Sequence, residues 1–188
     1  STLALLCLDA IAMDGELVEA ACAKAEAQGL TIPRENILVC ASHTHSGPVL
    51  EGALSDIYPL ERQHQEAIRK YSAHLENRIV SLAGEALGSM AAARLSSQNG
   101  VVRFQVNRRN NPGAALSHQA HLNGPNDYAV PVLKVADSSG KAIALLFGYA
   151  CHATVLDIYQ FSGDYPGYAQ LELERLYPGT TAMFFQGA

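Results

Sequence analysis

The order of the segments at the start of the chain is the feature that most restricts its fold. Residues 3–9 form a short apolar run that ends on an acid, and residues 37–41 form a second apolar run. Between them, residues 14–29 carry apolar side chains at helical spacing, with Asp14 placed to cap the first amides and Gly29 placed to end the helix. This strand–helix–strand pattern predicts layers of helices and β-strands.

The rest of the chain continues the mixture. Further helices are predicted at residues 60–90 and 165–177, and further strands at residues 130–136, 142–151 and 181–186. Residues 94–106 are expected to be extended, with a hairpin turn at Asn99-Gly100. Residues 107–127 are polar and rich in Gly, Pro and Asn, and we expect a long loop there. The sequence therefore predicts an α/β fold in which mixed β-sheet layers are flanked by helices, with residues 1–188 forming a single domain.

The composition is that of a globular protein. Of the 188 residues, 48% are hydrophobic and 16% are charged, which suits one domain with a sizeable core. The net charge is −5 and no run of Lys or Arg occurs, which argues against a nucleic-acid-binding surface. No segment approaches the roughly 20 apolar residues that a membrane-spanning helix needs. The four cysteines are widely spaced, lack the C-x-x-C spacing of zinc sites and are expected to be free thiols.

Three histidines follow predicted strands. His43 and His45 come just after the run at residues 37–41, and His152 comes just after the run at residues 142–151. In extended backbone His43 and His45 point to the same side, so both can face one pocket. If neighbouring parallel strands carry the two runs, all three imidazoles emerge at one sheet edge, where open α/β sheets bind ligands. A zinc site and a set of ordinary polar histidines then remain equally good interpretations.

Other polar residues border predicted elements. Asp9 ends the first strand, where it either supports a metal ligand or is simply solvated. Arg108 and Arg109 begin the polar loop, where an arginine either binds a carboxylate, phosphate or oxyanion or lies in solvent. Ser162 or Asp164 can cap the helix that follows them.

Five motifs give the chain a resemblance to a known enzyme family. In chain order they are SHTHSGP at residues 42–48, NRR at 107–109, CHAT at 151–154, SGDYPGYA at 162–169 and FFQGA at 184–188. Together they resemble the N-terminal catalytic domain of the neutral/alkaline, non-lysosomal ceramidase family. The likeness spans nearly the whole chain, and SHTHSGP is its most specific motif.

The resemblance implies a zinc-dependent amidohydrolase with one zinc ion in the complete site. His43 and His152 match two histidine ligands of the family's zinc. His45 matches a histidine that sits beside the zinc and helps to hold the reacting carbonyl, and Arg108 matches a pocket arginine, with Arg109 as the adjacent alternative. The expected reaction is cleavage of an amide (N-acyl) bond in a small-molecule or lipid-like substrate, assisted by a metal that polarises the carbonyl.

The sequence also departs from the family. The family's glutamate and tyrosine ligands and its nucleophilic serine would lie beyond residue 188, so we expect a segment of a larger catalytic domain, truncated at both ends and with an incomplete site. After His152, the sequence lacks the Pro and the Ser-Met-Asn run of true ceramidases. Two alternatives stay open: a catalytically inactive ligand-binding relative, and a metal-dependent phosphoesterase that uses Asp9 and Asp164.

Overall fold

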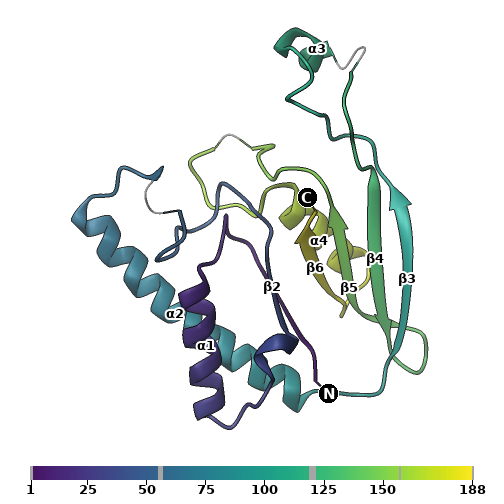
Figure 1. Ribbon diagram of the computed structural model, residues 1–188. Coiled ribbons are helices and arrows are strands. Elements are labelled where there is room, and N and C mark those ends of the chain that lie inside the picture. The colour runs from purple at the N-terminus through teal and green to yellow at the C-terminus, as the bar shows by residue number, and fades with distance from the viewer. Residues whose placement is uncertain (1, 55–56, 119–121, 157, 188) are drawn as a thin grey trace. The chain divides into compact units, whose positions relative to one another are not determined.

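The computed structural model describes residues 2–54, 57–118, 122–156 and 158–187 (Figure 1). The chain forms two compact units, one made of Ser1–Ala92 and Ala153–Ala169, the other of Ala93–His152 and Gln170–Ala188. Helices occur together with two sheets, one of them mixed, so the predicted α/β class is confirmed. The prediction that residues 1–188 form a single domain stays a prediction.

The first unit begins with the predicted strand–helix–strand segment. Strand β1 (Ala4–Leu8) and strand β2 (Ile37–Ala41) are parallel neighbours, connected through helix α1 (Gly15–Ala27) and the short helix η1 (Arg34–Asn36). The Asp14 carboxylate accepts the N–H of Glu16 at 3.0 Å, and Gly29 has a φ of 80° just after the helix. Both predicted helix boundaries are therefore confirmed, with the capping chemistry expected from the sequence.

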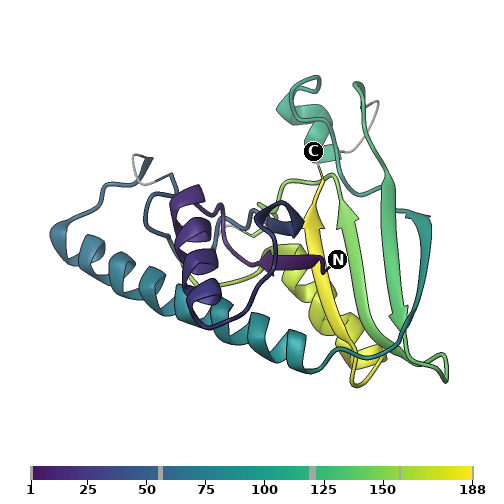
Figure 2. The same ribbon diagram turned by 60° about the horizontal axis from the view of Figure 1, so that its bottom comes forward.

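Helix α2 (Arg62–Gly88) packs against α1, as Figures 1 and 2 both show. Between the two helices, the Lys24 ammonium group contacts the carboxylate of Glu76 and donates a hydrogen bond to Asn77 at 2.9 Å. A small core of Ala10, Leu50 and Ala53 forms near the start of α1, with Leu75 of α2 packed against it. In the described ranges no helix, α2 included, is long and apolar enough to cross a membrane.

The second unit is built on a four-stranded sheet in the order β3-β4-β5-β6 (Figure 2). The strands are β3 (Arg94–Val101), β4 (Ala129–Ala136), β5 (Ala142–Tyr149) and β6 (Thr181–Gln186). The first three are antiparallel and β6 is parallel to β5, so the sheet is mixed. Phe147 and Phe184 are buried beside each other, with ring centroids 5.4 Å apart. Helix α4 (Asp164–Leu176) provides the crossover between β5 and β6.

Two expectations about strands and loops are corrected. The predicted hairpin at Asn99-Gly100 is wrong: Asn99 pairs with Pro131 and Gly100 pairs with Val130 in one uninterrupted strand. Long-range pairing with β4 outweighs the local turn preference. The predicted loop at residues 107–127 contains a short helix, α3 (Gly113–His118).

Candidate metal centre

His43 and His45 project from a turn and not from extended backbone. His43 has a φ of 61°, in the left-handed region, so the prediction of an extended segment is wrong. The β1–β2 ladder continues one residue beyond β2, because the Ser42 N–H donates to the Leu8 carbonyl at 2.9 Å, and the chain turns immediately afterwards. The imidazole rings of His43 and His45 nevertheless lie beside each other, with centroids 5.1 Å apart and an interplanar angle of 87°. A non-glycine residue held at such a φ costs about 1–3 kcal/mol, and strain of this kind is often found at functional sites.

The ring of His43 is oriented by a backbone carbonyl. Its Nδ1 lies 2.6 Å from the carbonyl oxygen of Ile11. Because a carbonyl oxygen only accepts, Nδ1 carries the proton and donates, which leaves the lone pair on Nε2. Metal-binding histidines commonly have this arrangement, since the second ring nitrogen fixes both the tautomer and the ring direction.

The electrostatic surroundings favour the neutral form of His45. Burial lowers the pKa of His45, and the neighbouring His43 lowers it further, although the Asp164 carboxylate acts in the opposite direction. A lowered pKa favours the uncharged imidazole, which has a lone pair to offer to a metal or to a proton donor.

The backbone brings His152 to the same place. His152 is bonded to Ala153, a residue of the first unit whose carbonyl accepts the N–H of His45 at 3.4 Å. Potential ligand atoms of His43, His45 and His152 lie within 4.8 Å of one another, and three imidazoles at this separation can hold a metal ion. The expected arrangement, in which neighbouring parallel strands of one sheet carry the two runs, is wrong, because β2 and β5 belong to separate sheets.

The segments around the histidines are joined by hydrogen bonds within the first unit. The fully buried Thr44 donates its hydroxyl proton to the Ser162 carbonyl at 2.8 Å, and the same hydroxyl oxygen accepts the Ser46 N–H at 3.2 Å. In return, the Ser162 N–H donates to the Ser46 carbonyl at 2.9 Å. The motifs at residues 42–48 and 162–169, far apart in the sequence, are thus one structural unit.

Two other candidates from the sequence, Arg108 and Asp9, are described by their own surroundings. Arg108 is an exposed residue of the second unit, in a loop where the Asn107 side chain accepts the N–H groups of Arg109 and Asn110, both at 3.1 Å. Its expected place in the pocket stays a prediction. Asp9 is exposed and borders a hollow of about 280 Å³, but it does not belong to the group of potential metal ligands.

Asp164 is the residue whose importance the sequence understates. It was expected as a helix cap or, in the phosphoesterase alternative, as a carboxylate of the metal site, yet its carboxylate is buried and accepts backbone N–H groups from the segment that follows His152. The backbone of Asp164 is also left-handed, with a φ of 53°. No pattern of residue types in the sequence indicates that conformation.

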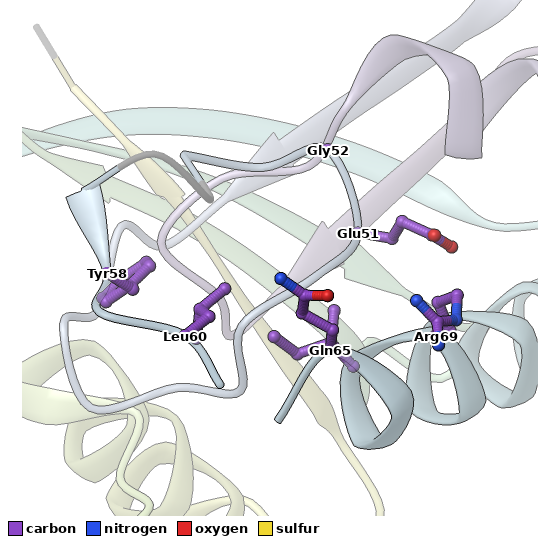
Figure 3. A pocket seen from close by; sticks show the side chains of 7 residues that line it. Glu51, Gly52, Tyr58, Leu60, Gln65 and Arg69 are labelled. Carbon is purple, nitrogen blue, oxygen red and sulfur yellow. The ribbon is translucent and has the colours of Figure 1, made fainter. Parts of the chain in front are cut away.

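A larger hollow of about 420 Å³ lies elsewhere in the first unit (Figure 3). Gln65 and Arg69 of α2 form one side of it, and Glu51 and Gly52 lie across from them. None of the three histidines lines this hollow, so it is not part of the candidate metal centre.

The fold is shared with ceramidases of known structure. The neutral ceramidase from Pseudomonas aeruginosa matches with a TM-score of 0.71 and 22% sequence identity, over 95% of this chain and 29% of that protein. A ceramidase complexed with C2 matches with a TM-score of 0.71 and 23% identity, over 95% of this chain and 28% of that protein. The sequence matches no protein-family model and no curated protein. The expected ceramidase-like fold is confirmed, and the chain spans less than a third of the length of these ceramidases.

Proposed function

We propose that this chain supplies part of the metal centre of a zinc-dependent, ceramidase-like hydrolase that cleaves an amide (N-acyl) bond. The observation that carries the proposal is the group formed by His43, His45 and His152, whose potential ligand atoms lie within 4.8 Å of one another. Its occurrence on a fold shared with ceramidases supports the proposed reaction class. The proposed substrate is a small-molecule or lipid-like N-acyl amide.

The residues of the group suit one zinc ion. Imidazole nitrogen is a preferred donor for zinc, and the hydrogen bond from His43 Nδ1 to the Ile11 carbonyl puts the lone pair of that ring on Nε2. Among the residues with described positions, no carboxylate belongs to the group, and the Asp164 carboxylate already accepts backbone N–H groups. These features count against a two-metal phosphoesterase, for which carboxylates bridging the ions would be expected.

Each residue has a proposed role. His43 and His152 bind the metal, and His45 and Arg108 stabilise the negative charge that develops on the carbonyl oxygen. Zinc, when bound, supplies Lewis acidity to a carbonyl oxygen and promotes ionisation of water at neutral pH. The neutral form of His45, favoured by its lowered pKa, can donate one N–H towards the carbonyl oxygen.

The test is hydrolysis of N-acyl amides by the complete protein that contains this chain. A series of amides with short and long acyl groups would be compared for the wild type, His43→Ala, His152→Ala and the control His74→Ala, which changes an exposed histidine on α2. We expect hydrolysis by the wild type and the control, and a loss of at least about 100-fold in both metal-site variants. Binding of amides without any turnover would indicate a ligand-binding relative, and unchanged turnover in His43→Ala and His152→Ala would refute the proposed site.

A further inference from the structure

The Asp164 carboxylate is buried and accepts three backbone N–H groups. Its residue is only 1% exposed. Oδ1 accepts the N–H groups of Val155 at 3.3 Å and Tyr165 at 2.6 Å, and Oδ2 accepts the N–H of Leu156 at 2.9 Å. A buried carboxylate is tolerated only when such donors replace its hydration, and these three N–H groups supply that replacement.

Two of the three donors belong to the segment that carries His152. Val155 and Leu156 follow His152 by three and four residues and belong to neither a strand nor a helix. Ala153 in the same segment is fully buried, and its carbonyl accepts the N–H of His45. The segment is therefore fixed at one end by His45 and at the other by Asp164.

The backbone of Asp164 is strained in a way that a simple helix cap does not need. Its φ of 53° lies in the left-handed region, whereas capping residues ordinarily have extended backbone. The strained conformation is supported from the other side, because the Ser162 hydroxyl oxygen accepts the Asp164 N–H at 3.1 Å. In this conformation the carboxylate accepts the N–H groups of Val155 and Leu156 as well as that of Tyr165 in the first turn of α4.

We propose that Asp164 is a positioning residue of the metal centre: its buried carboxylate holds the segment after His152 and thereby fixes His152 beside His43 and His45. The proposal deepens the proposed function and rests on it. Asp164 binds neither metal nor substrate in this account; it acts through the backbone N–H groups of Val155 and Leu156. Supporting groups of this kind typically change metal affinity by about 10–100-fold when they are removed.

The variant Asp164→Asn tests the proposal in the complete protein. Asparagine tolerates left-handed backbone about as well as aspartate, but its amide nitrogen is a donor and cannot accept an N–H. The matched control is Asp137→Asn, because Asp137 is an exposed carboxylate that accepts the N–H groups of Ser139 at 2.8 Å and Lys141 at 3.0 Å in the β4–β5 turn. A second variant, Asp164→Gly, relieves the backbone strain and removes the carboxylate altogether.

Two quantities would be measured: the zinc dissociation constant, by competition with a chelator, and the NMR order parameter of the His152 backbone amide. In Asp164→Asn we expect zinc affinity to fall by about 10–100-fold and the order parameter to fall from about 0.85 to below about 0.6, while Asp137→Asn keeps both values. Asp164→Gly should show at least the same losses, and wild-type zinc affinity in either Asp164 variant would overturn the proposal.

The two readouts separate this proposal from the proposed function. If the wild type binds no zinc, the proposed function fails, and the order parameter alone decides the role of Asp164. An unchanged order parameter in folded Asp164→Asn refutes the positioning role, whatever the zinc result. A reduced order parameter with zinc affinity within twofold of the wild type also refutes it, because Asp164 would then order the segment without serving the metal centre.

Discussion

Thr44 offers the most direct test of how the histidine motif is held. Its side chain is completely buried, and its hydroxyl group donates to the Ser162 carbonyl at 2.8 Å and accepts the Ser46 N–H at 3.2 Å. Thr44→Val keeps the shape of the side chain but removes both hydrogen bonds. Thr44→Ser keeps the hydroxyl group and removes one methyl group.

The expected magnitudes follow from these contacts. A buried donor or acceptor left without a partner costs about 1–3 kcal/mol, and two groups lose their partner in Thr44→Val. Ser46 and Ser162 are only half-buried, so water can partly replace the lost bonds, and we expect unfolding to become easier by about 2–4 kcal/mol. Thr44→Ser should cost only about 1 kcal/mol, the value of one buried methyl group.

Urea denaturation of the complete protein measures both free energies of unfolding. The account predicts that Thr44→Val is clearly less stable than Thr44→Ser. Wild-type stability in Thr44→Val, or a larger loss in Thr44→Ser than in Thr44→Val, would show that packing and not hydrogen bonding holds this segment.

Two further predictions concern the backbone and the thiols. In Gly187→Ala the new Cβ would lie 2.9 Å from the backbone N and Cα of Ala150, so we expect the free energy of unfolding, measured by urea denaturation, to fall by about 1–3 kcal/mol. In the control Gly88→Ala the new Cβ meets no atom within 4 Å, and the free energy of unfolding should change by less than about 1 kcal/mol. Equal effects of the two substitutions would contradict the close approach of the backbone at Gly187. Burial raises the pKa of Cys7 to about 11, with smaller contributions from neighbouring groups, so only about 0.1% of it is thiolate at pH 8. Its alkylation by iodoacetamide, followed by mass spectrometry, should therefore rise about tenfold per pH unit from pH 8 to 10, and a plateau near pH 9 would contradict the raised pKa.

The local elements were largely predictable because local chemistry determines them. Asp14 and Gly29 mark the ends of α1 through a side-chain cap and a left-handed φ, both of which depend on the residue type itself. Asn99-Gly100 failed as a turn signal because its backbone groups pair with β4, about 30 residues later in the chain. Pairing of this kind is a property of the whole sheet and cannot be read from a dipeptide.

The sequence predicted which histidines form the candidate site, but not the backbone contacts that bring them together. His43, His45 and His152 were expected at strand ends and do come together, yet β2 and β5 lie in different sheets. The segments that carry the histidines are joined instead by hydrogen bonds to the Ala153 carbonyl, from the Thr44 hydroxyl and to the Asp164 carboxylate. His43 and Asp164 both have left-handed backbone, which neither residue type requires and which the sequence therefore does not indicate.

We propose that His43 and His152 hold one zinc ion beside His45, and the zinc content per chain is the most direct test of that assignment. Metal content would be measured by mass spectrometry in the complete protein for the wild type, His152→Ala, His45→Ala and the exposed control His74→Ala. The account predicts about one zinc in the wild type and the control and a loss of zinc in His152→Ala, while retention in His45→Ala would assign that histidine to the carbonyl and not to the metal. Absence of zinc from the wild type, or full retention in His152→Ala, would contradict the account.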